Sequence, residues 1–381
     1  MSNNRPVPVE HPGTFIKEEL EARNWDQVDL AYILGMLPQQ LNPILNGRNN
    51  ITPDMAALLG AAFGMPADFF ANLQKMYDLH RTKPVDPGVR TRANWLSVFP
   101  VRDMIKRGWI EETEPSLLDV QMMRFFGKSS IDEIPFIGDL GVIPAHAPKK
   151  SGGYESTTPS QYTWLHRVIT IAKNIQCTDY SELKLRENLS TIRKHLLDKD
   201  DLREIPAILA KCGVRFIVVE PLPGSKIDGV CVWVDGQPAI GMTTRHDRLD
   251  NFAFVLRHEC EHILQGDGRL ETFSPIDEIA FDFENDDLPV EELRANQAAS
   301  EFCVPKQQLQ SFLLRKGQFI SEQDVLAFST RLEIHPAIVI GQIQHKTNKY
   351  GWLRKYQSGV RQYLMDWKYV DGWGNVFPAT L

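Results

Sequence analysis

Residues 252–266 read FAFVLRHECEHILQG, and this stretch carries the strongest chemical signal in the chain. If this stretch is drawn as a helix, apolar residues occupy most of its circumference, which predicts a buried helix. His258 and His262 are four positions apart, so their imidazoles project from one helix face about one turn apart. Because an isolated buried Glu259 would be costly, this polar face predicts a cavity or a bound cation.

The HExxH spacing at 258–262 predicts a zinc site, since two histidines can bind one ion while Glu259 touches a water at the metal. A hydrolytic zinc takes three protein ligands and leaves one position for water. Glu292, which begins the next strong helical pattern, is the preferred third ligand over its neighbour Glu291. Asn296 lies one turn beyond Glu292, where its amide could orient a ligand histidine.

Upstream of this helix, residues 214–242 change to the pattern of strands. Apolar runs rich in β-branched residues are separated by Pro-Gly and Asp-Gly turn signals, which predicts a small antiparallel sheet. The edge near 230–234 could accept an extended peptide by strand addition, and an ordinary packed strand is the alternative. The predicted fold class is therefore mainly α with a small antiparallel sheet, α+β.

The first eighty residues have a strong helical period with short polar breaks. One helix is expected from Thr14 to Arg23, and a second from the N-cap Asp26 to Gly35. A third covers residues 39–47, and Thr52 with Pro53 predicts the start of a fourth. Two helices joined by a tight glycine-containing turn are typical of a helix-turn-helix.

In a helix-turn-helix, the first residues of the second helix contact base edges in the major groove. The candidate DNA-binding residues are Gln39, Gln40 and Asn42 for bases, with Gln27 and Arg48 for phosphates. Two features oppose DNA binding: five basic and nine acidic residues give residues 1–80 a net charge of −4, and Pro43 interrupts the expected recognition helix. A protein-binding or dimerising role is the alternative.

Composition sets the broader class of the protein. The 381 residues carry a formal charge of −7, which argues against an indiscriminate polybasic nucleic-acid surface. No apolar run approaches the roughly 18 to 20 residues of a spanning helix, and the five scattered cysteines form no CxxC pair. We expect a cytoplasmic protein with reduced cysteines and no membrane association.

Four regions are expected. They are a helix-turn-helix domain at 1–80, a helical linker or docking region at 81–204 that opens with the linker PVDPGVRTRANW, a zincin-like domain at 205–310, and a C-terminal helical extension with an aromatic tail at 311–381. The aromatic tail either packs on the chain's own core or binds a partner such as a chaperone.

Two family resemblances follow from these motifs. HPGTFIKEELEARNWDQVDLAYILGM at 11–36, LNPILNGRNNIT and LGAAFGMPADFFANLQKMYDL resemble the HigA-type antitoxins of the Xre helix-turn-helix class. IDGVCVWVDGQPAIGM, FVLRHECEHILQG and EELRANQAASEFCVP resemble the ImmA/IrrE zinc metallopeptidases. The second resemblance implies His258, His262 and Glu292 as zinc ligands and Glu259 as the catalytic base; Cys260 and Glu261 depart from the family's small or apolar residues.

Together these patterns predict a toxin–antitoxin-type transcription regulator. It would join a DNA-binding helix-turn-helix to a zinc-dependent endopeptidase that acts on a regulatory protein, with operator DNA and a protein substrate or cognate toxin as partners. Paired operator half-sites favour a homodimer. The alternative is a non-catalytic antitoxin or scaffold that neutralises a toxin and whose metal is structural.

Overall fold

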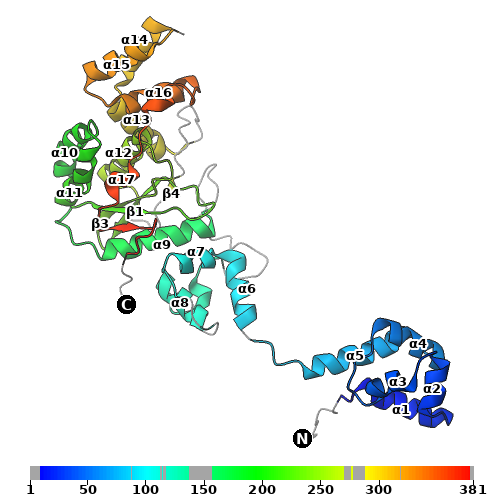
Figure 1. Cartoon of the computed structure of the whole chain (residues 1–381). Coiled ribbons are helices and arrows are strands. Elements are labelled where there is room, and N and C mark those ends of the chain that lie inside the picture. Colours follow the sequence, from blue (N-terminus) through cyan, green and yellow to red (C-terminus); the bar gives the residue numbers. More distant parts are fainter. Residues whose placement is uncertain are drawn as a thin grey trace. The chain divides into compact units, whose positions relative to one another are not determined.

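A computed structural model describes residues 9–86, 88–111, 114, 117–136, 157–269, 276–277, 288–317 and 319–377. The chain divides into two compact units, residues 1–86 and 87–381 (Figure 1). Among the described residues, no helix is both long and apolar enough to cross a bilayer.

The first unit is a bundle of five helices. They are α1 (Pro12–Arg23), α2 (Gln27–Ile33), α3 (Pro38–Leu45), α4 (Pro53–Phe63) and α5 (Ala67–Arg81). The expected caps are present: the Asp26 carboxylate accepts the backbone N–H groups of Val28 and Asp29, and the Thr52 hydroxyl accepts that of Met55. Pro43 lies inside α3, and the helix continues past it to Leu45.

A short connection joins α2 to α3. Gly35 has a φ of +67°, a left-handed conformation that glycine adopts without strain. Ile16, Leu30, Leu41 and Leu59 are fully buried and come from four different helices. The helices therefore pack around one apolar core that fixes α2 against α3.

The larger unit contains the remaining helices and the sheet. Its α-helices are α6 (Gly88–Val98), α7 (Val101–Lys106), α8 (Leu118–Phe126), α9 (Pro159–Lys173), α10 (Glu182–His195), α11 (Ile205–Lys211), α12 (Leu249–Gln265), α13 (Val290–Cys303), α14 (Lys306–Lys316), α15 (Glu322–Leu332), α16 (Pro336–Thr347) and α17 (Arg361–Leu364). The expected linker is shorter than predicted, because residues 88–98 form α6, whose Trp95 is buried and donates to Asp119 of α8.

The sheet is mixed, which corrects the expectation of an antiparallel sheet. Its strands are β1 (Arg215–Val219), β2 (Gly229–Val234), β3 (Gln237–Met242), β4 (Ile276–Asp277) and β5 (Val370–Asp371), in the order β4-β2-β3-β1-β5. β2 pairs antiparallel with β3 and β4, whereas β1 pairs parallel with β3 and β5. The Pro-Gly segment after β1 does not close a hairpin, so β3 lies between β1 and β2.

Helices cover both faces of this sheet. α9 packs on one face through Trp164 and Val168, which join a core with Ile217 and Val230 (Figure 1). Alternate strand residues such as Phe216 point to the other face and pack with α12 and α11. α12 is thereby buried between the sheet and the helices α13 and α16.

The aromatic tail packs on the chain's own sheet and is not wholly helical. Tyr369 is buried, β5 pairs with β1 at Val218 and Val219, and the Trp367 indole N–H donates to the Phe216 carbonyl at 2.9 Å. The backbone pairing of β5 is a feature that the helical period of residues 311–360 could not reveal. Binding of a chaperone to this tail stays a prediction.

Candidate functional site

Helix α12 carries the site, and its sequence explains its path. Fourteen of its seventeen residues are buried, from Leu249 to Leu264, because the sheet and α13 cover it on opposite sides. The helix ends at Gly266, whose φ of +73° forms a left-handed cap. The predicted HExxH segment therefore lies in the last two turns of a fixed helix.

Two helices bring three candidate metal ligands together. His258 and His262 of α12 and Glu292 of α13 each offer a ligand atom, and these atoms lie within 4.8 Å of one another. The two histidine Nε2 atoms are 3.0 Å apart, and Nε2 of His258 lies 3.3 Å from Oε2 of Glu292. All three side chains are buried, whereas Glu291 is exposed, so the geometry favours Glu292 over its neighbour.

This ligand set fits a divalent transition metal. Two imidazoles and one carboxylate match the His2Glu set of catalytic zinc sites. A buried Glu292 also needs a positive partner, which a cation supplies. Among the described residues, this is the one cluster of His, Cys, Asp and Glu that meets the geometry of a metal site.

Glu259 follows the candidate ligand His258 on α12, and its side chain lies against the sheet. Its side chain is completely buried, and its carboxylate approaches the backbone of Gly229 at the start of β2. A Cβ atom on Gly229 would come within 2.5 Å of Oε1 of Glu259 and 2.7 Å of Val255. Glycine at 229 therefore allows the strand to approach the glutamate, a role that the sequence analysis did not assign.

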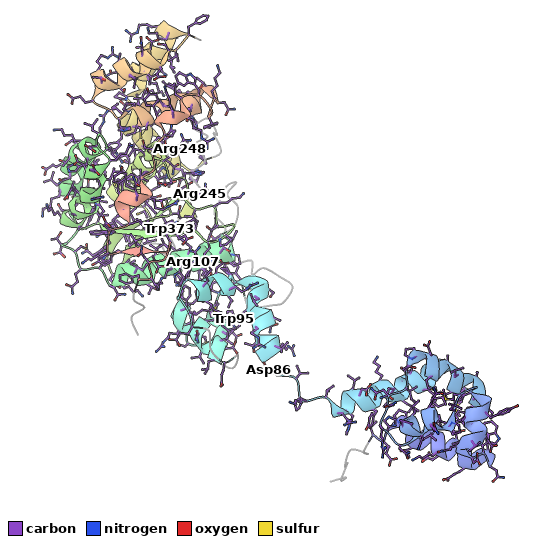
Figure 2. The ribbon with its side chains drawn as sticks, in the orientation of Figure 1. Asp86, Trp95, Arg107, Arg245, Arg248 and Trp373 are labelled. Atoms are coloured by element: carbon purple, nitrogen blue, oxygen red, sulfur yellow. The ribbon has the colours of Figure 1, made fainter. Side chains whose placement is uncertain are left out.

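The segment before Gly229 is held by an ion pair. Arg245, labelled in Figure 2, donates from Nε and Nη2 to the two oxygens of the buried Asp228, each at 2.8 Å. The Thr243 hydroxyl donates to the Ile227 carbonyl at 2.7 Å. These contacts fix the strand start against which Glu259 packs.

Asp267 is a functional candidate that the sequence reasoning missed. Its Oδ2 lies 2.9 Å from Nδ1 of His262 and accepts a hydrogen bond from Nη2 of Arg294 at 2.7 Å. Burial alone raises the pKa of Asp267, but the bonds from His262 and Arg294 outweigh it and the pKa lies below its ordinary value. The signal in the sequence is an acid directly after the helix-ending glycine.

Asn296 was the predicted orienting residue. It is buried, and in the part of the chain that the structure describes its Oδ1 accepts no hydrogen bond. The geometry gives Asp267 the contact with His262, and the role of Asn296 stays a prediction.

The two unusual residues of the motif have ordinary structural partners. Glu261 accepts hydrogen bonds from Arg257 and Gln265, both at 2.7 Å. Cys260 points into the core, and burial raises the pKa of its thiol to about 12. Neither side chain competes with the ligands.

In the first unit, the predicted DNA-contacting side chains share one property. All five are exposed: Gln27, Gln39, Gln40, Asn42 and Arg48. Oε1 of Gln40 accepts the Leu37 backbone N–H at 3.1 Å, and Oδ1 of Asn42 accepts a hydrogen bond from Asn46. Gln39 thus has the most freedom to reach a base edge.

Comparisons with known proteins match this first unit. A sequence model of helix-turn-helix domains matches residues 16–70. Virulence-associated protein I of Dichelobacter nodosus is 35% identical over 74 residues, which are 19% of this chain and 68% of that protein.

Two solved structures are also similar to part of this chain. An addiction module antidote protein of the HigA family from Coxiella burnetii is 35% identical, over 19% of this chain and 80% of that one, with a TM-score of 0.19. The antitoxin HigA of Pseudomonas aeruginosa, solved with the higBA promoter, is 30% identical over 21% and 99%, with a TM-score of 0.18.

Proposed function

Because the chain belongs, through residues 16–70, to the helix-turn-helix family, we propose that its first domain binds operator DNA as an antitoxin-type transcription regulator. The exposed amides of α3 support this proposal, since glutamine and asparagine pair with adenine in the major groove. With a net charge of −4, residues 1–80 bind by base contacts more than by counterion release.

Fluorescence anisotropy with the DNA upstream of the chain's own gene tests this role. Gln39→Ala should weaken binding by about 1 to 3 kcal/mol, while Asn72→Ala on the exposed surface of α5 serves as the matched control. The salt dependence should be shallow, because few phosphates are neutralised. Binding that is equal for this DNA and a shuffled sequence contradicts the proposal.

For the larger unit, we propose a zinc-dependent endopeptidase of the ImmA/IrrE type with a zincin-like fold, acting on a regulatory protein or a cognate toxin. The observation that carries this proposal is the convergence of His258, His262 and Glu292, with the buried Glu259 next to His258 in the sequence of α12. A structural metal site has no use for this fourth, acidic side chain.

The chemistry divides between the ion and Glu259. When bound, zinc lowers the pKa of water toward about 7 and polarises the peptide carbonyl. The Glu259 carboxylate accepts the proton of the attacking water and passes it to the leaving amine. Gly229 leaves room for that carboxylate against β2, where the side chain is completely buried.

Elemental analysis of the purified full chain tests the ligand set. We expect about one zinc per chain in the wild type, its loss in His258→Ala and Glu292→Ala, and its retention in Glu291→Ala, the exposed neighbour. A wild type that binds no zinc after purification without chelators overturns the peptidase proposal.

The alternative is a non-catalytic scaffold with a structural ion. Its support is that all three ligands are buried, which is typical of a closed site. Glu259→Gln separates the two functions, because it removes the base and keeps the ligands. Loss of proteolysis or of toxin neutralisation in this variant, with zinc retained, favours the enzyme, and unchanged neutralisation favours the scaffold.

A further inference from the structure

A cavity with a largely apolar surface and a few polar side chains lies near the N-terminal end of α12. It has a volume of about 200 Å³ and is formed between the start of α12 and α16. Its described lining comprises His246, Arg248, Asp250, Asn251, Gly341, Gln342, His345 and Tyr350. Arg248, labelled in Figure 2, marks its place on the larger unit.

Two buried amides face this cavity without partners. Asn251 of α12 is 6% exposed and Gln342 of α16 is 8% exposed. Within the described ranges, neither side chain makes a hydrogen bond or ion pair to protein. The amides can therefore hydrogen-bond to a ligand that enters the cavity.

The charges around the cavity offset one another. Arg248 donates from Nε to Oδ1 of Asp250 at 3.0 Å and from Nη2 to Oδ2 at 2.6 Å. The same Nη2 donates to Oε1 of Gln344 at 2.9 Å. Asp250 also packs on the backbone of α16, since a Cβ atom on Gly341 would overlap its carboxylate. The ion pair is therefore fixed in place and presents no net charge to a ligand.

The volume limits the ligand further. The cavity is far larger than the roughly 10 to 15 Å³ that one water needs, and it is below the roughly 300 Å³ at which pockets for drug-sized ligands begin. A single side chain or a group of similar size fits between these limits. Asn251 and Gln342 line the cavity, and each amide has a donor and an acceptor. A group that complements them therefore also carries a donor and an acceptor side by side.

We propose that this cavity binds the carboxamide side chain of a glutamine or asparagine in a polypeptide substrate. The assignment to a substrate rests on the proposed peptidase function. Asn251 and His258 are seven residues apart on α12, so they share one helix face, about 10 Å apart along the axis.

Side-chain amide NMR of the deuterated, ¹⁵N-labelled full chain tests the pocket. N-acetyl-glutamine methylamide should shift the amide signals of Asn251 and Gln342 in a saturable way. Isosteric N-acetyl-glutamate methylamide should bind at least tenfold more weakly, because it lacks the donor. Equal binding of the two compounds, no saturable shift, or stronger binding of adenosine, whose base edge also pairs with amides, overturns the proposal.

Variants assign the effect to the two amides. Gln342→Met and Asn251→Ser should each weaken the glutamine probe at least tenfold, whereas Gln310→Met on the exposed surface of α14 should leave it unchanged. The probe is titrated with a chelator present, so the result does not depend on zinc or on hydrolysis. If the chain binds the probe but takes up no zinc, the proposed pocket is supported and the peptidase proposal is overturned. If the chain takes up zinc but does not bind the probe, the peptidase proposal stands and the proposed pocket is overturned.

Discussion

Asp267 acts on the metal site through His262. Its carboxylate oxygen is 2.9 Å from the histidine Nδ1, and Arg294 holds that carboxylate from α13. Such partners orient a ligand imidazole and raise its basicity. Asp267→Asn should therefore weaken zinc binding by about 10 to 100 fold, measured by competition with a chromophoric chelator.

Asp366→Asn, an exposed acid of the same unit, is the control for lost negative charge. A cobalt-substituted Asp267→Asn chain should also show an altered visible spectrum, because the imidazole is no longer oriented. Zinc affinity equal to that of the wild type would show that Asp267 is not needed to orient His262.

His166 on α9 makes the stability of the larger unit depend on pH. Burial, reinforced by Lys128 and Lys173, lowers the pKa of His166 to about 4. The unfolded histidine titrates near 6.5, so the folded state binds fewer protons, and stability present above pH 6.5 is lost as the pH falls toward 4. The loss amounts to about 3 kcal/mol.

Urea unfolding at pH 7.5, 6.5, 5.5 and 4.5 measures this effect. His166→Phe keeps an aromatic ring against Phe126 and Tyr162 and removes the titrating group. The free energy of unfolding of the wild type should fall below that of the variant as the medium is acidified. Parallel curves for the two proteins would assign the acid sensitivity to other groups.

At the scale of elements, the contact of β2 with α12 depends on the small size of Gly229. Gly229→Ala places a Cβ within 3.0 Å of Glu259 and Val255, so the strand or the helix must shift. We expect a loss of about 1 to 3 kcal/mol in stability and lower hydrolytic activity with zinc retained.

Chemical denaturation and elemental analysis of the same sample check this prediction. Gly351→Ala is the matched control, because its Cβ would meet no atom within 4 Å. If both variants behave like the wild type, Gly229 is not needed for the position of Glu259.

Local sequence signals predicted the helices well and the sheet only in part. The Asp26 and Thr52 caps, the apolar α12 and the start of α13 depend on neighbours a few residues away, so their patterns are visible in the chain. The parallel pairing of β1 with β3 and β5 depends on distant residues and leaves no periodic signal. The cavity between α12 and α16 was missed for the same reason, whereas Asp267 has a local signal, the acid directly after Gly266.

Across the larger unit, one buried ionic network joins distant parts of the chain. Asp371 of β5 accepts hydrogen bonds from Nε of Arg167 on α9 at 2.8 Å and from the indole N–H of Trp109 at 2.7 Å. Arg167 also donates to the Phe377 carbonyl at 2.9 Å. The segment after α7 that contains Trp109, the helix α9 and the C-terminal tail therefore all depend on the Asp371 carboxylate.

Asp371→Ala leaves a buried guanidinium without its counterion and should destabilise the larger unit by about 3 to 5 kcal/mol. The double variant Arg167→Leu, Asp371→Leu should recover part of that loss, because no charge stays buried. Guanidinium unfolding of the single and double variants measures both values. A double variant that recovers none of the loss would show that the pair is not coupled.

The pairing of Val218 with Val370 also has a consequence for biosynthesis. More than 150 residues separate the two, so at about 5 to 20 residues per second the ribosome needs roughly 8 to 30 s to supply β5 after β1 has been made. During that interval the outer edge of β1, with the sequence RFIVV, has no neighbour and can pair with other chains. The helix-turn-helix unit is synthesised first, so it has time to fold while the outer edge of β1 is still unpaired.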